Sequence, residues 1–156
     1  MNGQIFNILF LCTGNSARSI LGERILTHVG GGHFQGFSAG SHPTGKVNPF
    51  ALKTLARHGL AGGDLRSKSW DEFARPGAPQ MDGVITVCDT AAGETCPLWP
   101  GSPATAHWGL ADPAAGEGSD EQITALFEET FAILQSRIRQ LIQDPGSVFA
   151  SQKVIT

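Results

Sequence analysis

The chain has 156 residues, of which 40% are hydrophobic and 16% are charged, and its formal net charge at pH 7 is −3. A chain of this length is expected to fold as one domain with a substantial core. Nucleic-acid binding normally depends on a basic surface, so this charge argues against a nucleic-acid partner. Three cysteines, an odd number, fit reduced thiols better than a structural disulfide framework.

The first ten residues, MNGQIFNILF, carry no basic segment ahead of the apolar run. That run is also too short to span a bilayer. We therefore expect a cytoplasmic protein without a membrane partner.

Four apolar or β-branched runs predict short strands, of the kind that is buried in a parallel sheet. In chain order they are residues 5–11 (IFNILFL), 36–40 (GFSAG), 82–89 (DGVITVCD) and 105–110 (TAHWGL). Helical spacing predicts helices at 20–29, 49–59, 67–74 and from 119 to about 143. Strands that alternate with helices indicate an α/β fold with a parallel sheet.

The last predicted helix begins with a capping box, in which the Ser119 and Gln122 side chains each bind the other residue's backbone N–H. One face of this helix is apolar and consists of Ile123, Leu126, Phe127, Phe131, Leu134, Ile138 and Leu141. Asp144-Pro145-Gly146 ends the helix. We expect residues 1–146 to form a single domain and residues 147–156 to form a loose C-terminal tail.

The segment CTGNSARS, residues 12–19, joins the first strand to the first helix. A glycine-containing loop in this position aims backbone N–H groups at an anion, and the helix dipole assists. Arg18 adds a planar fork that matches a tetrahedral oxyanion, and the same positive surroundings favour the thiolate of Cys12. Ser19 would donate a hydrogen bond to this thiolate, and Asn15 would brace the loop. The alternative is a buried structural cysteine with Arg18 on the surface.

The loop therefore predicts one site that binds a tetrahedral oxyanion and presents Cys12 to it as a nucleophile. The residues predicted to surround the anion are Thr13, Gly14, Asn15, Ser16, Ala17, Arg18 and Ser19.

CTGNSARS resembles the phosphate-binding loop of the low-molecular-weight protein tyrosine phosphatases and of the arsenate reductases built on that fold. The resemblance continues through SAG (38–40), VNP (47–49), VCD (87–89), the cysteine before Pro97, HWG (107–109) and ADP (111–113). It implies a three-layer fold with a four-stranded parallel sheet and helices on both faces. It also implies that Cys12 is the nucleophile, that Arg18 holds the oxyanion and that Asp112 is the general acid.

The other two cysteines, Cys88 and Cys96, have seven residues between them. Reduction of arsenate to arsenite consumes two electrons, which thiols would supply. The resemblance to the reductases implies that Cys88 attacks Cys12 and that Cys96 then attacks Cys88. An external thiol, from thioredoxin or from glutaredoxin and glutathione, would reduce the resulting disulfide without any bound cofactor. The alternative is a buried Cys88 and an incidental Cys96.

Two absences favour a reductase over a phosphatase. Ala114 and Ala115 follow Asp112-Pro113, where the phosphatases usually carry aromatic residues that hold a phosphotyrosine ring, and the chain contains no tyrosine. We therefore expect arsenate as the substrate, with phosphate or sulfate as mimics. Hydrolysis of phosphate monoesters through a Cys12 phosphoenzyme remains the alternative.

The chain departs from many relatives at Ala17, where they carry a second loop cysteine. Some relatives also hold a potassium ion beside the loop. Its candidate ligands are Asn15, Glu23, Ser38 and Asp71, although Glu23 also fits a solvated helix face. We expect no other metal.

Overall fold

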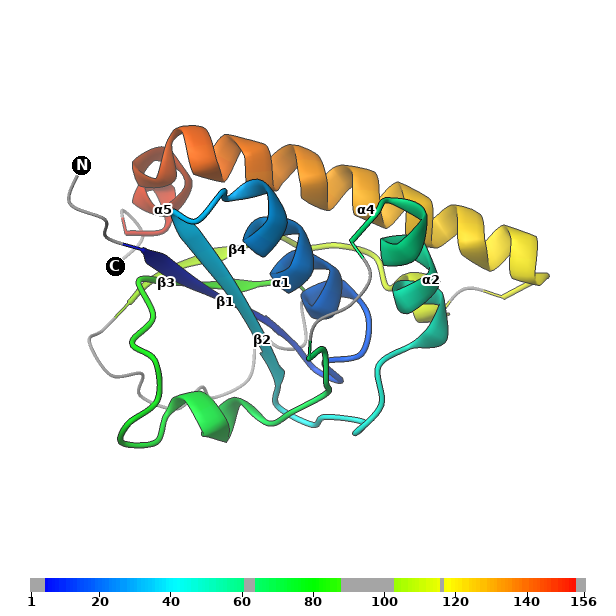
Figure 1. Ribbon diagram of the computed structural model, residues 1–156, viewed down its shortest axis with the longest axis horizontal. Helices are drawn as coiled ribbons and strands as arrows, with labels where there is room; N and C mark the ends of the chain where they lie inside the picture. The colour runs from blue at the N-terminus through cyan, green and yellow to red at the C-terminus, as the bar shows by residue number, and fades with distance from the viewer. Residues whose placement is uncertain (1–4, 61–63, 88–102, 116, 154–156) are drawn as a thin grey trace.

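The computed structural model describes residues 5–60, 64–87, 103–115 and 117–153. Four parallel strands form one sheet in the order β2-β1-β3-β4 (Figure 1). The strands are β1 (Phe6–Cys12), β2 (Phe34–Gly40), β3 (Gly83–Thr86) and β4 (Ala104–His107). The helices are α1 (Arg18–Val29), α2 (Pro49–Arg57), α4 (Asp120–Gln143) and α5 (Pro145–Lys153), with 3-10 turns η1 (Trp70–Phe73) and η2 (Pro113–Ala115).

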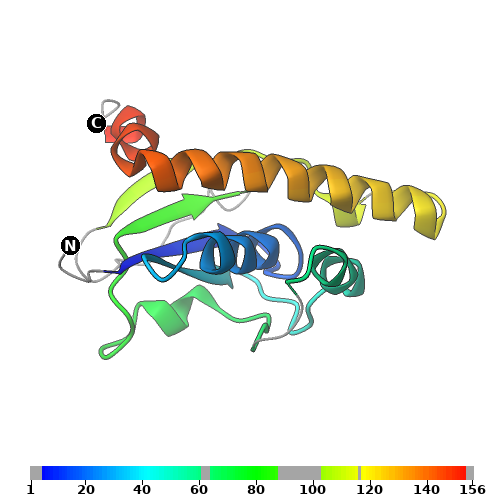
Figure 2. The ribbon, with the colours of Figure 1, turned by 45° about the horizontal axis from the view of Figure 1, so that its top comes forward.

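The sheet is the middle of three layers. Helices α1, α4 and α5 cover one face, and η1 lies on the other, as Figure 2 shows. Along β1, Ile8 and Phe10 point into the core under the helices, while Leu9 and Leu11 point into the smaller core under η1. All four side chains are buried, which is why this strand reads as a continuous apolar run. The predicted three-layer α/β fold is confirmed.

Helix α1 packs directly on β2 because β2 carries a glycine at the crossing. A Cβ atom at Gly36 would lie 2.4 Å from the Glu23 carbonyl oxygen, closer than atoms can approach. The Gly36 N–H also donates to the Thr27 hydroxyl at 3.0 Å. This close packing brings the Glu23 side chain to Ser38 on the same strand.

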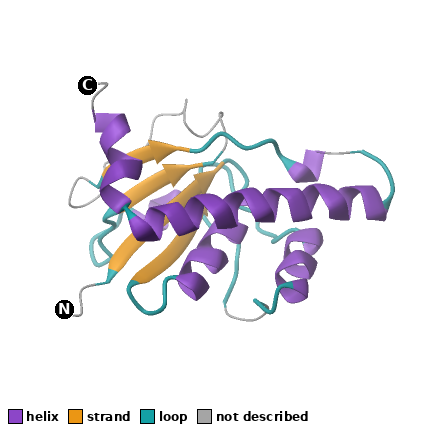
Figure 3. Cartoon of the chain, turned by 90° about the horizontal axis from the view of Figure 1, so that it is seen from above, coloured by secondary structure: helices purple, strands orange, loops and turns teal. Residues whose placement is uncertain are grey.

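Helix α4 runs along the sheet and beyond it to α2 (Figure 3). Its predicted capping box is present, with Ser119 Oγ accepting from Gln122 N and Gln122 Oε1 accepting from Ser119 N. Most of the predicted apolar face is buried, but Leu126 is 37% exposed and marks the edge of that face.

The prediction of a loose tail after residue 146 is wrong for the described part of this segment, because α5 continues there. Asp144 caps α5 by accepting from Ser147 N, and Pro145 takes the first helical position, where its missing N–H costs nothing. Phe149 is buried and lies over β3, since a Cβ atom at Gly83 would come within 2.4 Å of its ring. The tail prediction failed because α5 is anchored by one buried aromatic side chain, and its sequence otherwise lacks the regular spacing of apolar residues that predicts a helix.

The predicted helix at 67–74 is reduced to the single turn η1. Residues before it are extended because they pair with the end of β2, where Gly40 N donates to Lys68 O at 2.9 Å. This pairing holds the 67–69 segment against the loop that follows β1. Within the described ranges, no helix has both the length and the apolar character needed to cross a membrane.

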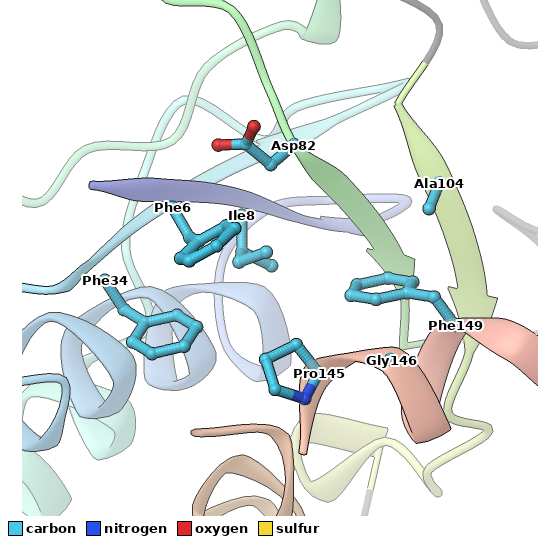
Figure 4. A pocket seen from close by; sticks show the side chains of 8 residues that line it. All are labelled: Phe6, Ile8, Phe34, Asp82, Ala104, Pro145, Gly146 and Phe149. Atoms are coloured by element: carbon cyan, nitrogen blue, oxygen red, sulfur yellow. The ribbon is translucent and has the colours of Figure 1, made fainter. Parts of the chain in front are cut away.

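A hollow of about 330 Å³ lies at the amino-terminal ends of the strands (Figure 4). Phe6, Phe34 and Phe149 give it apolar walls, and Asp82 lies at its edge. In parallel α/β sheets, ligands bind at the opposite, carboxyl ends of the strands. The candidate site is therefore expected at that other end.

Candidate active site

The candidate site lies where β1 ends and α1 begins. Strand β1 has β2 on one side and β3 on the other, so successive connections leave it in opposite directions. Such a switch point is where open α/β sheets bind ligands. Cys12 is the last residue of β1 and is buried, and Arg18 is the first residue of α1.

Three carbonyl groups of the intervening loop are bound from outside. Thr13 O accepts from His42 N, Gly14 O from Thr44 N and Ser67 Oγ, and Ser16 O from Asn48 N, all at 2.9–3.0 Å. In a trans peptide, the N–H of the next residue points away from the carbonyl. The amides of Gly14, Asn15 and Ala17 are therefore turned toward the centre of the loop, as an anion site requires.

The end of β2 must be glycine for this loop to fit. A Cβ atom at Gly40 would lie 2.5 Å from Thr13 O and 3.0 Å from the backbone nitrogen of Asn15. The SAG motif thus lets the second strand support the loop from below.

A chain of hydrogen bonds leads to Cys12. Lys68 N donates to Asn15 Oδ1 at 2.8 Å, Asn15 Nδ2 donates to Ser19 Oγ at 2.7 Å, and Ser19 Oγ lies 3.1 Å from Cys12 Sγ. Since the Ser19 oxygen already accepts from Asn15, its own proton is free to be donated to a Cys12 thiolate. Asn15 is fully buried and has φ 47°, a left-handed conformation that asparagine tolerates better than most residues.

Arg18 joins the loop to the segment that follows β4. Its Nη1 donates to Leu110 O at 2.7 Å, and its Nη2 lies 3.7 Å from Asp112 Oδ2. The other Asp112 oxygen accepts from Ala114 N at 2.9 Å and so caps the η2 turn. The structure thus places the predicted acid beside the predicted oxyanion-binding arginine. The Asp112 side chain is 40% exposed, so it faces solvent rather than the core.

Of the four residues considered as potassium ligands, Glu23 and Ser38 lie together, with Ser38 Oγ donating to Glu23 Oε1 at 2.5 Å. Asp71 is exposed on η1. The Lys68 ammonium lies 3.3 Å from Ser38 Oγ and 3.8 Å from Glu23 Oε1. Burial raises the pKa of Glu23, whereas burial lowers the pKa of Lys68.

Sequence reasoning missed Lys68 and Ser67, which both contact the loop. They lie in a short polar segment, LRSKSWDEF, and nothing in its pattern sets the lysine apart from a solvated one. Only the pairing of this segment with Gly40 brings it beneath the loop.

Cys88 and Cys96 lie outside the described residues, so the structure does not test the predicted relay. Val87, the residue before Cys88, donates its N–H to Leu11 O at 2.8 Å. His107 shares a 2.7 Å hydrogen bond with Thr86, and Trp108 packs on Phe10. In the part of the chain that the structure describes, no three histidine, cysteine or acidic side chains gather as a metal site would require.

Comparison with known proteins matches this architecture. The profile of the low molecular weight phosphotyrosine protein phosphatases matches residues 7–150. A curated arsenate reductase of Halalkalibacterium halodurans is 36% identical over 132 residues, which cover 85% of this chain and 91% of that protein. The chain therefore belongs to the low molecular weight phosphotyrosine protein phosphatase family.

Two solved structures extend the comparison. One, described as an arsenate reductase in the phosphate binding state, has a TM-score of 0.72 and 25% identity, covering 90% of this chain and 98% of that one. The other, a thioredoxin-dependent arsenate reductase of Corynebacterium glutamicum, has a TM-score of 0.64 and 26% identity, covering 92% of this chain and 64% of that one. The family thus contains reductases as well as phosphatases.

Proposed function

We propose that this protein reduces arsenate to arsenite. The observation that carries the proposal is the juxtaposition of Cys12 and the inward-turned loop amides with Arg18 and Asp112. Arsenate is a tetrahedral oxyanion, and such a loop would hold its oxygens while the thiolate faces the central atom. The named arsenate reductases that resemble this chain over most of its length support this substrate.

In the first step, the Cys12 thiolate attacks arsenic and an As–O bond breaks. Arg18 and the loop amides stabilise the charge on the remaining oxygens, and Asp112, as the general acid, protonates the departing oxygen. The product is a sulfur–arsenic(V) adduct on Cys12, and the departing oxygen leaves as water. Release of the Arg18–Asp112 contact as the anion binds would free both groups for these roles, because the 3.7 Å separation is a loose ion pair.

In the second step, the Cys88 thiolate attacks Cys12 Sγ. A Cys12–Cys88 bond forms, the S–As bond breaks, and its electron pair reduces As(V) to As(III), which leaves as arsenite. Cys96 then attacks Cys88, releasing Cys12 and forming the 88–96 disulfide. The segment after β3 supports this order. Val87 donates its N–H to the carbonyl of Leu11, the residue before Cys12, and Cys88 follows Val87 in the sequence.

An external thiol completes the cycle by reducing the 88–96 disulfide. We favour a thioredoxin or a glutaredoxin system, and the thioredoxin-dependent enzyme among the similar structures supports the first of these. A cytoplasmic location would suit the cycle, because that compartment keeps thiols reduced.

Mass spectrometry after a single arsenate turnover tests the relay. We expect an 88–96 disulfide in the wild-type protein and a trapped disulfide between residues 12 and 88 in a Cys96→Ser variant. Undiminished arsenate turnover by Cys88→Ser would overturn the relay.

A phosphatase is the second candidate, because the matching family is defined by phosphotyrosine phosphatases. It would need Cys12 and Asp112 but neither Cys88 nor Cys96. The pair Ala114-Ala115 after Asp112-Pro113 offers no aromatic ring to grip phosphotyrosine. Rapid hydrolysis of a phosphate monoester by the Cys88→Ser, Cys96→Ser double variant, together with no reduction of arsenate by the wild type, would favour this candidate.

A further inference from the structure

Beneath the oxyanion loop, the side chain of Lys68 ends among oxygen atoms. Its Nζ donates to Arg66 O at 2.8 Å and to Ser38 Oγ at 3.3 Å, and it lies 3.8 Å from Glu23 Oε1. The Lys68 side chain is only 8% exposed. A carbonyl, a hydroxyl and a carboxylate therefore surround one buried positive charge.

This set of oxygens is of the type that binds a hard metal cation. A lysine ammonium is a compact point charge with three donors, so it can satisfy the same three oxygens. Glu23 and Ser38 are two of the residues that the resemblance suggested for potassium, yet here both face the ammonium. The residues present therefore do not fit a potassium ion in addition to Lys68.

The same residue reaches the reactive end of the loop through its backbone. Lys68 N donates to Asn15 Oδ1, and Lys68 O accepts from Gly40 N. Because Asn15 Oδ1 accepts from Lys68 N, the side-chain nitrogen Nδ2 of Asn15 must face Ser19. The Ser19 hydroxyl in turn faces the Cys12 sulfur. Anchoring the lysine side chain thus fixes the peptide that orients this chain of hydrogen bonds.

We propose that Lys68 is a positioning residue that serves as the resident cation of the active site. Its ammonium takes the place of a monovalent metal ion between Glu23 and Ser38 and holds Asn15 in register with Ser19. Oxyanion binding and Cys12 reactivity are then independent of potassium in the wild-type protein. Removal of the ammonium, as in Lys68→Met, creates a requirement for an added cation.

The test compares the wild type with Lys68→Met, the charge-conserving Lys68→Arg and a control, Lys53→Met, whose lysine lies over Phe50 on α2. Inorganic phosphate binding is measured by calorimetry. Alkylation of the Cys12 peptide by iodoacetamide is followed by mass spectrometry across pH. Each measurement is made in potassium chloride and in tetramethylammonium chloride at equal ionic strength, because the second cation is too large for the site.

We expect the wild type and Lys53→Met to behave alike in both salts. Lys68→Met should lose about tenfold or more in phosphate affinity in tetramethylammonium chloride. Potassium chloride should restore part of that loss and part of the Cys12 alkylation rate. Lys68→Arg should keep both properties in tetramethylammonium chloride. A residue that only packs would give a loss that potassium does not relieve.

Besides a loss that potassium does not relieve, two other results would overturn the proposal. One is potassium-dependent phosphate binding by the wild type, and the other is equal behaviour of Lys68→Met and the wild type in both salts. If Lys68→Met does not fold, thermal unfolding of the wild type decides. A melting temperature raised by potassium, relative to tetramethylammonium, would show that the metal ion still binds. The role of Lys68 rests on the proposed function of the same loop. None of these measurements needs arsenate turnover, so a failure of the Lys68 proposal can be told apart from a failure of the proposed arsenate reduction.

Discussion

At the scale of single residues, the Ser19 hydroxyl lies within hydrogen-bonding distance of the Cys12 sulfur, at 3.1 Å. Both groups are buried, so water cannot readily replace this contact. A hydrogen bond to a charged acceptor in such surroundings contributes about 1.5–3 kcal/mol. The reactivity of Cys12 should therefore depend on this hydroxyl.

We predict that Ser19→Ala slows alkylation of Cys12 at pH 7 about tenfold, because the thiolate loses a donor that favours it. The rate is measured on the Cys12 peptide by mass spectrometry. Thr105→Ala, which removes an exposed hydroxyl on β4, is the control and should leave the rate unchanged. An unchanged rate in Ser19→Ala would mean that the loop amides alone sustain the thiolate.

The Glu23–Lys68 pair makes a second prediction at this scale. Removing one member of a buried ion pair leaves the other charge uncompensated and costs roughly 3 kcal/mol. Lys68→Met and Glu23→Gln should each lower the free energy of unfolding in urea, whereas the double variant should lose much less than the sum. Strictly additive losses would show that the two side chains do not interact.

At the scale of elements, α2 and α4 are joined by Glu128, which accepts from Arg57 Nε and shares a hydrogen bond with His58 Nε2, each at 2.7 Å. The His58 ring also stacks on Phe131 of α4, with ring centres 3.9 Å apart. Burial alone would raise the pKa of Glu128, but the hydrogen bonds from His58 and Arg57 outweigh it and lower this pKa below 4.5. The carboxylate is thus part of the link between the two helices.

A lowered carboxylate pKa contributes stability that is present above the unfolded-state value and is lost as pH falls through the folded-state value. We therefore predict that Glu128→Gln is less stable than the wild type at pH 6 and that the difference shrinks at pH 3.5. Urea unfolding at the two pH values measures it. The matched control is Glu129→Gln, since Glu129 is exposed on the same helix. A difference that stays constant with pH would contradict the assignment.

At the scale of the whole molecule, the two ends of the sheet have different tasks. The carboxyl ends of the strands carry the oxyanion loop, whereas α5 covers part of the amino end through Phe149. We predict that Phe149→Ala lowers the free energy of unfolding by about 3 kcal/mol, as loss of a buried aromatic ring does. Phosphate binding at the far end should be unchanged.

The control for Phe149→Ala is Leu52→Ala on α2, whose side chain is 44% exposed and should change stability by less than about 0.5 kcal/mol. If both variants unfold at the same urea concentration as the wild type, α5 contributes nothing to the core.

Much of this molecule is predictable because its signals are local. Apolar runs place the strands, Ser119 and Gln122 place the start of α4, and CTGNSARS places the loop. The failures concern contacts between distant segments. The position of Lys68 under Asn15 depends on how its segment pairs with Gly40, and α5 depends on the space beside Gly83 that the Phe149 ring occupies. Neither leaves a periodic pattern in the chain.

The outward-facing carbonyls of the loop have a consequence for how binding is accomplished. Because neighbouring segments already bind Thr13, Gly14 and Ser16, the conformational entropy of the loop is lost during folding rather than on arrival of the anion. Substrate then meets a rigid receptor, and most of its interaction energy is available for affinity. Substitution of a residue that supports the loop without touching the substrate, such as Ser67, should consequently change both the affinity for the anion and the stability of the fold.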